Sequence, residues 1–439
     1  MRDMAKNQAA RPRSVSLLLI AITLPAIIAF ALLYRQRLSV PYQDDYNVIL
    51  AFTVQYQNLP TWQAKLVHIL TYQTNDYKLG FEHAIVALQM ALAGHLNFGF
   101  LELLGNLFLL PTGYLLWRAY QTETGDLAQR LVEFLPVSVL WFSLSYWETL
   151  NWAMAGLQAL PVIPFSLLSI YLLIPKGAAE PGRARLLLSC LCAILATFSS
   201  ANGFFLVPVG LLLLLRRRAY ADSMAWCASF VLPLACYLYH YTPSHETLHT
   251  MHRTWQIPKF FYHFFLFLGC ALPFRWAATL LGMAICAVLF LALHSRFDRT
   301  NPVAFYFTTW ILIIAVVVAW VRGLSAPRYS MYSIFLLIFC YVFLRQYLPG
   351  RLASFNPRRF YLVTVVLAVG FCFFSDLDAY RHLDARRRMV LSGLEHYRAN
   401  PEVNSPMIDP AVRQMFPAEE ESERATLTKA IQEHVYTLP

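Results

Sequence analysis

The sequence predicts an all-α, polytopic membrane protein, and composition is the first reason. Of the 439 residues, 58% are hydrophobic and only 14% are charged, and the mean hydropathy is +0.47. These values lie far outside the averages of soluble proteins. The second reason is that apolar runs long enough to cross a bilayer, about 20 residues each, recur along most of the chain.

Charge and cysteine placement argue against other classes. The formal net charge is +10, but Lys and Arg are distributed between the apolar runs. A nucleic-acid groove would require them to cluster on one surface. All eight cysteines lie inside or at the edge of apolar segments, so neither a disulfide framework nor a Cys-based metal site is indicated. The sequence also lacks a Gly-rich phosphate loop and a Rossmann fingerprint, which argues against a cytosolic nucleotide site.

The first element is an apolar run from Ser14 to Tyr34 that follows a basic stretch. It is too long for the hydrophobic region of a typical cleaved signal peptide, so we expect a signal anchor with residues 1–14 in the cytoplasm. This orientation places residues 35–96 outside as one folded loop. Within it, Leu79–Leu96 is apolar but interrupted by polar residues, which predicts an amphipathic helix at the outer surface.

Eleven crossings are expected in a membrane domain of residues 15–375. After the first, they are predicted at 97–117, 131–147, 153–174, 186–200, 203–216, 223–241, 277–294, 303–321, 331–345 and 360–375. The loops placed inside carry about twice as many Lys and Arg as the outer loops, which supports this topology. An odd number of crossings puts the small C-terminal region, residues 376–439, outside, with helices expected at Asp384–Tyr397 and Glu419–Val435.

Two adjacent carboxylates, Asp44 and Asp45, directly follow the first crossing. Charged groups beside lipid are costly, which makes them candidates for function. The alternative is that they cap a helix terminus or end a solvated loop. Because neighbouring side chains point in different directions, one carboxylate can enter a cleft while the other braces the loop. Either can act as a general base that takes a proton from an attacking hydroxyl group.

A second polar element, Asn75–Lys78, closes the same external loop. The carboxylate of Asp76 can hold a metal ion or a sugar hydroxyl, and the ammonium of Lys78 can contact a phosphate. The alternative is an exposed loop in which this acid and this base pair with each other. Glu82 and His83 follow one turn later and can share that face, or they can extend to the interface as ordinary polar side chains.

Two later outer loops carry further candidates. Trp147 and Glu148 lie in an aromatic stretch, which is ordinary at a membrane interface but can also stack on sugar rings. Arg322 and Arg328 lie in a short Gly/Pro turn followed by Tyr329. The arginine fork suits phosphate, so these residues can neutralise a phosphate leaving group, or they can extend to the interface without any role in chemistry.

The sharpest competing motif is His245-Glu246-Thr247-Leu248-His249, which fits the zinc-protease pattern of two histidines four residues apart with a glutamate between them. A zinc protease places this motif in a long helix and needs a third ligand. Here it falls in a loop of about 17 residues, which leaves three readings open: a protease, a metal or phosphate site within another enzyme, and a plain interfacial loop.

Taken together, these elements resemble the bacterial integral-membrane glycosyltransferases of the GT-C fold. Their uncharacterised branches often show a Gln-Asp-Asp-Trp-like element, a His-Asn-Glu-His-Arg-like element and a Ser-Arg-Tyr-like element. Asp44 and Asp45 match the first, Asp76 and Lys78 match the Glu and Arg of the second, and Arg328-Tyr329 matches the third. The chain departs from the pattern at Thr74 and Tyr77, where the family often has His.

The resemblance implies a transferase in the bacterial inner membrane. It would move a sugar, with inversion, from a polyprenyl-phosphate donor to an extracytoplasmic glycan, lipid or protein acceptor. Some such enzymes use a divalent metal ion and others do not. The implied roles are catalysis by Asp44, Asp45 and Asp76; donor-phosphate binding by Lys78, Arg322, Arg328 and Tyr329; acceptor or sugar contacts by Tyr46, Glu82, Trp147 and Glu148; and a metal site at His245, Glu246 and His249.

The alternative class is a non-enzymatic transporter or flippase for a lipid-linked glycan. It would also need polar groups inside the membrane domain and arginines outside it. Transporters tend to bind their substrate near the midplane between repeated halves. The sequence shows no repeat, and its charged candidates gather in loops on one side, which favours the enzyme.

Overall fold

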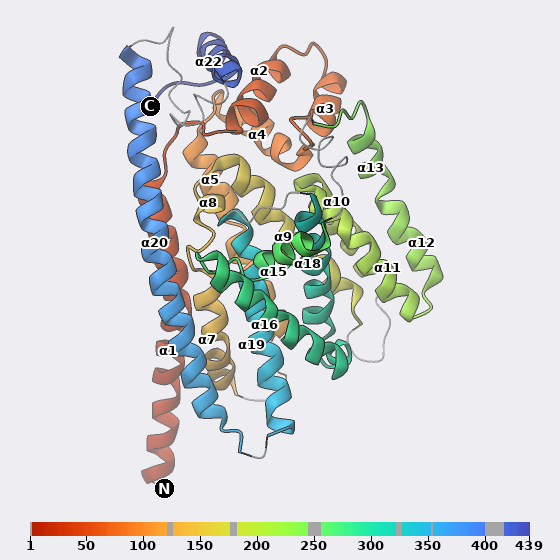
Figure 1. Ribbon diagram of the computed structural model, residues 1–439, viewed down its shortest axis with the longest axis vertical. Helices are drawn as coiled ribbons and strands as arrows, with labels where there is room; N and C mark the ends of the chain where they lie inside the picture. Colours follow the sequence, from red (N-terminus) through yellow and green to blue (C-terminus); the bar gives the residue numbers. More distant parts are fainter. Residues whose placement is uncertain are drawn as a thin grey trace. The chain divides into compact units, whose positions relative to one another are not determined.

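The computed structural model describes residues 2–120, 126–175, 182–244, 256–321, 327–352, 354–399 and 417–439, with side chains described from residue 15 to 399 and from 421 onward. These residues form helices throughout, and their only extended pairings are two isolated β-bridges, Thr74 with Tyr77 and Leu96 with Tyr436 (Figure 1). The prediction of an all-α protein is confirmed.

The chain divides into two compact units, each assembled from three stretches of sequence. Unit 1 contains Met1–Arg35, Leu109–Trp147 and Gln256–Tyr380, and unit 2 contains Gln36–Phe108, Glu148–Trp255 and Arg381–Pro439. Unit 1 contains most of the long apolar helices, and unit 2 contains the acidic loop.

The helices of unit 1 begin with α1, which runs to the boundary with unit 2, and end with the first part of α20, which continues into unit 2. They are α1 (Arg2–Gln36), α6 (Leu109–Tyr120), α7 (Leu127–Trp141), α15 (Ile257–Leu268), α16 (Arg275–His294), α17 (Phe297–Thr300), α18 (Pro302–Val321), η3 (Pro327–Tyr329), α19 (Ser330–Tyr347), η4 (Leu348–Gly350) and α20 (Pro357–Ala399).

The helices of unit 2 are mostly shorter. They are η1 (Tyr46–Ala51), α2 (Phe52–Gln57), α3 (Trp62–Thr71), α4 (Gly80–Ala93), α5 (Phe98–Asn106), α8 (Trp147–Leu150, at the boundary with unit 1), α9 (Ala153–Leu173), α10 (Arg183–Ser199), η2 (Ala201–Phe205), α11 (Leu206–Arg216), α12 (Tyr220–Ser229), α13 (Val231–Leu238) and α22 (Pro417–Gln432).

Among the described residues, eight segments are long and apolar enough to cross a membrane. They are Val15–Gln36, Phe98–Tyr120, Ala153–Leu173, Tyr220–Leu238, Arg275–His294, Pro302–Val321, Pro327–Gly350 and Pro357–Ala399. Each coincides with a predicted crossing, so the chain is a multi-pass membrane protein.

The predicted number of eleven crossings is not confirmed. The crossings predicted at 131–147 and 186–200 are helices of 15 and 17 residues, α7 and α10. At 1.5 Å per residue they extend about 22–26 Å, less than a hydrocarbon core of about 30 Å. The crossing predicted at 203–216 is a short apolar segment, Ala201–Arg216, that starts with the 3₁₀ turn η2.

The last predicted crossing continues without a break into the region predicted as a tail. Helix α20 has 43 residues and contains both the crossing predicted at 360–375 and the helix predicted at Asp384–Tyr397. At 1.5 Å per residue it is about 65 Å long, about twice the thickness of a hydrocarbon core.

Two glycines set the crossing of α15 and α16 in unit 1. A Cβ atom built on Gly282 would lie 1.9 Å from the carbonyl oxygen of Phe265, and one built on Gly269 would lie 1.9 Å from that of Ala278. Any larger residue at these positions would force the two backbones apart. The glycines therefore allow α15 to pack directly on the backbone of α16.

The core of unit 2 joins the start of the external loop to the end of the chain. Val40, Tyr46, Leu427 and Tyr436 are buried in one hydrophobic cluster. The same cluster contains residues of η1, α2, α4, α5, α9 and α20. The hydroxyl of Tyr436 donates a hydrogen bond of 2.6 Å to the carbonyl oxygen of Ser39. This packing fixes the backbone on which the two adjacent carboxylates lie.

Candidate active site

Asp45 braces the acidic loop from inside. Its side chain is 1% exposed, and each carboxylate oxygen accepts one backbone N–H, from Tyr42 at 2.9 Å and from Met154 at 2.9 Å. Met154 is the second residue of α9, where helix N–H groups lack partners in their own helix. The carboxylate of Asp45 therefore closes the turn at Tyr42 and fastens it to the N-terminus of α9.

Burial dominates the electrostatics of Asp45. Loss of hydration raises its pKa to about 7. The hydrogen bonds from the backbone N–H groups of Tyr42 and Met154 act in the opposite direction, and the charge of the neighbouring Asp44 raises the pKa slightly further. At neutral pH this carboxyl group is divided between its protonated and ionised forms.

Asp44 occupies a different position in the same turn. It is partly exposed, and its backbone carbonyl accepts hydrogen bonds from Asn47 at 3.1 Å and from Val48 at 2.7 Å. Gln43, just before it, has a positive φ of 47°, so the chain turns sharply here. Of the two acids, Asp44 is the one that a substrate can reach.

The acidic turn packs against the buried side chain of an arginine from the C-terminal region. Arg386, on α20, donates a hydrogen bond of 2.7 Å to the carbonyl oxygen of Asn151, and its guanidinium lies 4.3 Å from the ring centre of Tyr42. The side-chain amide of Asn151 lies 3.4 Å from the carboxylate of Glu102. These contacts link Glu102, on α5, through Asn151 to Arg386, which lies against Tyr42.

The sequence analysis missed Arg386, Asn151 and Glu102. Glu102 could have been noticed as a single acid within an otherwise apolar crossing. Arg386 belongs to a run of three arginines in the predicted tail, and nothing in the sequence indicates that one of them turns inward.

Helix α4 has its polar side facing the protein. Glu82 is fully buried, and neither of its carboxyl oxygens has a hydrogen-bond partner among the described residues. His83 is 1% exposed and stacks on Phe52 with ring centres 4.2 Å apart. The exposed positions are apolar, with Leu92 79% exposed. The alternative in which Glu82 and His83 extend to the interface is therefore wrong, because both side chains are buried and the apolar face of α4 points outward.

Burial favours the uncharged forms of both Glu82 and His83. Burial raises the pKa of Glu82 well above its ordinary value, and the charges of Asp45 and Asp44 raise it further. Burial lowers the pKa of His83 to about 3. A buried carboxyl group whose pKa is raised by burial and by nearby acids is a frequent property of functional sites.

Replacing Glu82 with Gln is expected to stabilise the protein increasingly as the pH rises. The native state keeps a proton on Glu82 that the unfolded chain loses above about pH 4.5, so Glu82 lowers stability as the pH rises through that range. Gln removes this effect. We expect the melting temperature of the variant to exceed that of the native protein by a few degrees at pH 8 and to match it at pH 4.

The matched control is Glu421→Gln, at an exposed position on α22. It should leave the pH dependence of the melting temperature unchanged. A Glu82 variant that melts below the native protein at pH 8 would contradict the assignment of Glu82 as a neutral acid.

Asp76 holds the segment that follows α13. Its carboxylate accepts hydrogen bonds from the backbone of Ser244 at 2.9 Å, from the hydroxyl of Ser244 at 2.6 Å and from the hydroxyl of Tyr241 at 3.1 Å. Asn75, at the turn before it, has a positive φ of 51°. These contacts give Asp76 a positioning function at the start of the segment that carries the His245 motif.

Lys78 is buried beside the same segment. Its ammonium donates hydrogen bonds to the carbonyl oxygens of Cys236, at 3.3 Å, and of Tyr239. These carbonyls belong to the C-terminal end of α13, where a cation is favoured by the helix dipole. Burial lowers the pKa of Lys78. Both Asp76 and Lys78 therefore contact residues 236–244, which the sequence analysis did not foresee.

The other candidates lie in different surroundings. Tyr46 is fully buried in the core of unit 2, and Glu148, in the same unit, is half-buried. Trp147, Arg328 and Tyr329 belong to unit 1, where the guanidinium of Arg328 lies 5.6 Å from the ring centre of Tyr329. The roles assigned to these residues by the resemblance stay predictions.

Four candidate residues lie outside the described part of the chain: Arg322, His245, Glu246 and His249. Among the residues that are described, no group of three or more His, Cys, Asp or Glu side chains is arranged to hold a metal ion. The metal site predicted at residues 245–249 stays a prediction.

The chain is an all-α, multi-pass membrane protein. Its acidic turn carries a buried carboxylate, Asp45, next to a partly exposed one, Asp44. No protein-family model, curated protein or solved structure matches the chain.

Proposed function

We propose that this protein is a membrane glycosyltransferase in which Asp44 is the general base. It transfers a sugar, with inversion, from a polyprenyl-phosphate donor to an extracytoplasmic glycan, lipid or protein acceptor. The resemblance to GT-C glycosyltransferases suggests this reaction. The observation that supports it best is the difference between the two acids of the turn. Both carboxylate oxygens of Asp45 accept backbone N–H groups, whereas Asp44 is partly exposed.

In this mechanism, Asp44 takes the proton of the acceptor hydroxyl as its oxygen attacks the anomeric carbon. The bond between that carbon and the phosphate oxygen breaks on the opposite face, and its electron pair leaves with the lipid phosphate. Cationic side chains stabilise the negative charge that develops on the phosphate. For this role the resemblance offers Arg322, Arg328 and Lys78, together with the hydroxyl of Tyr329.

Asp45 is the weaker candidate for the base, although a pKa of about 7 would suit that role. A base must first reach the proton that it removes, and Asp45 is 1% exposed with both oxygens engaged. Its function in this proposal is to hold Asp44 in place. Trp147 and Glu148 are the proposed sugar or acceptor contacts. Tyr46 and Glu82 are fully buried, so in this proposal they support the site from the core.

The proposed location is the bacterial inner membrane, with the N-terminus in the cytoplasm and residues 35–96 and the C-terminal region outside. The bias of Lys and Arg in the predicted loops supports this orientation. Reporter fusions to the C-terminus that are active only in the cytoplasm or only outside it would test the orientation directly.

The function is tested with purified protein in proteoliposomes that contain radiolabelled polyprenyl-phosphate hexoses or pentoses together with acceptor lipids and glycans. Transfer of label to an acceptor supports the proposal. Movement of labelled donor between leaflets without transfer would instead identify a transporter or flippase. Addition of EDTA, followed by Mg²⁺ or Mn²⁺, decides whether transfer needs a divalent metal.

A further inference from the structure

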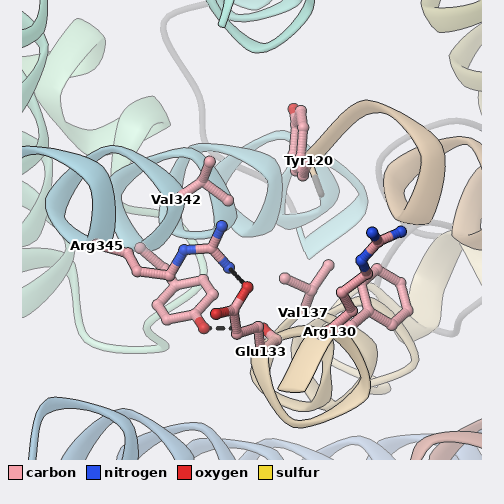
Figure 2. A pocket seen from close by; sticks show the side chains of 8 residues that line it. Tyr120, Arg130, Glu133, Val137, Val342 and Arg345 are labelled. Atoms are coloured by element: carbon pink, nitrogen blue, oxygen red, sulfur yellow. Dashed lines mark hydrogen bonds and ion pairs between the residues drawn. The ribbon is translucent and has the colours of Figure 1, made fainter. Parts of the chain in front are cut away.

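A pocket in unit 1 lies where three helices end, and glycosyl transfer gives it no role. It is lined by residues of α6, α7 and α19 (Figure 2). Three apolar side chains form part of its wall, and the polar lining residues are Tyr120, Arg130, Glu133, Tyr341 and Arg345. The polar lining thus contains two arginines and one acid.

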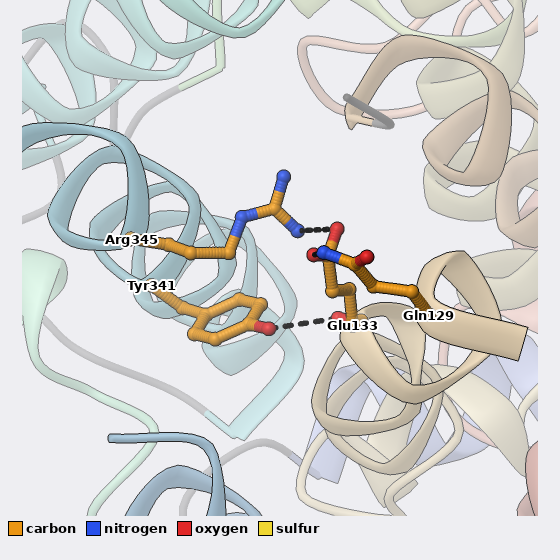
Figure 3. Close-up of polar contacts among 4 residues, drawn as sticks. All are labelled: Gln129, Glu133, Tyr341 and Arg345. Carbon is orange, nitrogen blue, oxygen red and sulfur yellow. Dashed lines mark hydrogen bonds and ion pairs between the residues drawn. The ribbon is translucent and has the colours of Figure 1, made fainter. Parts of the chain in front are cut away.

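A buried ion pair forms one side of the pocket (Figure 3). Nη1 of Arg345 lies 2.7 Å from Oε2 of Glu133, and both side chains are 9% exposed. The amide of Gln129 donates a hydrogen bond of 3.0 Å to Oε1 of Glu133, and the hydroxyl of Tyr341 donates one of 2.8 Å to the backbone carbonyl of Glu133. The acid is therefore satisfied by groups within the protein.

Two donors of the same pocket are not satisfied. Nη2 of Arg345 and the hydroxyl of Tyr120 are buried, and neither has a hydrogen-bond partner among the described residues. Leaving a buried donor without an acceptor is unfavourable, particularly on a charged group. A ligand oxygen in the pocket would accept from one or both of these donors.

The size of the pocket limits what can enter. Its enclosed space is about 10 Å³, which is room for one group of the size of a water molecule, and the pocket is partly open. A single oxygen of a larger anion fits inside while the rest of the anion stays at the mouth. A whole sugar or nucleotide does not fit.

The depth of the pocket points to the source of the anion. Tyr120 is the last residue of the candidate crossing Phe98–Tyr120, and Arg345 lies near the end of the candidate crossing Pro327–Gly350. Crossing helices end at the level of the lipid headgroups. Basic pockets between such helix ends bind anionic lipid headgroups, and the arginine fork matches the geometry of phosphate oxygens.

We propose that this pocket binds the phosphate group of an anionic membrane lipid, with phosphate oxygens accepting hydrogen bonds from Nη2 of Arg345 and from the hydroxyl of Tyr120. The positive charge of Arg130, which lines the same pocket, favours the anion. This binding is separate from glycosyl transfer and does not depend on it.

The test uses purified full-length protein in a neutral detergent, with phosphatidylglycerol, phosphatidylcholine or inorganic phosphate added. The readouts are the melting temperature and native mass spectrometry of bound lipid. We expect phosphatidylglycerol to bind and to raise the melting temperature, and phosphatidylcholine to have little effect. Inorganic phosphate distinguishes a soluble ligand from a lipid.

Two variants remove one donor each while keeping the ion pair. Arg345→Lys preserves the charge opposite Glu133 but removes Nη2, and Tyr120→Phe removes only a hydroxyl. Each is expected to weaken phosphatidylglycerol binding about tenfold, the effect of one hydrogen bond to a charged group. Without lipid, Tyr120→Phe should melt at or above the native temperature, because it removes an unsatisfied polar group.

The matched controls are Tyr114→Phe on the same helix, where the side chain is 60% exposed, and Arg351→Lys at an exposed position. Both should bind phosphatidylglycerol as the native protein does. Equal binding of the two lipids, or native affinity in both donor variants, would overturn the proposal and leave a water molecule as the occupant. Protection by inorganic phosphate alone would overturn the assignment to a lipid.

Discussion

Replacing Asp44 with Asn is expected to reduce sugar transfer by at least a hundredfold without affecting the fold. General-base catalysis contributes about 10²–10⁴-fold to a rate, and Asn has the shape of Asp but cannot take the proton. The backbone carbonyl of Asp44 accepts hydrogen bonds from Asn47 and Val48, and the substitution keeps both. The measurement is transfer of label in proteoliposomes, with the melting temperature recorded for the same preparation.

The neighbouring substitution, Asp45→Asn, is the matched control and should give the opposite result. The two oxygens of Asp45 accept N–H groups from Tyr42 and Met154. Asn keeps one oxygen and turns an NH₂ group toward the other N–H, so one backbone donor loses its acceptor. We expect a loss of stability of about 1–3 kcal/mol, with transfer reduced only as far as folded protein is lost.

Two outcomes would change the assignment of the acidic turn. Normal melting of Asp45→Asn together with a larger loss of transfer than in Asp44→Asn would make Asp45 the base. Full transfer by both variants would mean that the turn is structural and that another group of the protein is the base.

Replacing Glu133 with Leu is expected to destabilise unit 1 by about 3–5 kcal/mol. Removal of one partner from a buried ion pair leaves the other charge buried and uncompensated, and Arg345 is 9% exposed. The same substitution removes the acceptor of Gln129. The measurement is the melting temperature of the purified variant in detergent.

The double variant Glu133→Leu/Arg345→Met separates the charge effect from packing. Replacing a whole buried ion pair with apolar residues of similar size is often neutral or stabilising, so the double variant should melt close to the native protein. A double variant as unstable as the single one would show that the pair is needed for shape and not only for charge balance.

Much of the helical architecture could be predicted from the sequence, because the length and composition of an apolar run determine whether it can cross a membrane. All eight membrane-length segments coincide with predicted crossings. The three remaining crossings are not confirmed because an apolar run near 15 residues can be either a short crossing or a buried helix, as α7 illustrates. Helix length alone does not distinguish these.

The candidate site was less predictable, because its organisation depends on contacts between distant residues. The sequence marks Asp44 and Asp45 as a pair but cannot tell which one is buried, since the answer depends on an N–H group of Met154, 109 positions away. For α4 the sequence shows a polar and an apolar face, and only packing decides that Glu82 faces the protein. The inward orientation of Arg386 likewise depends on the tertiary fold.

The contact between Tyr436 and Ser39 has a consequence for the order in which the protein forms. The two residues are 397 positions apart, so the ribosome synthesises almost the whole chain before the acidic turn has its final partner. Contacts of such high sequence separation form late, because closing a long loop costs entropy before the contact compensates for it. During synthesis and membrane insertion, the packing around Asp44 and Asp45 is therefore incomplete. A nascent chain that ends before Pro417 lacks part of the hydrophobic core that holds these residues.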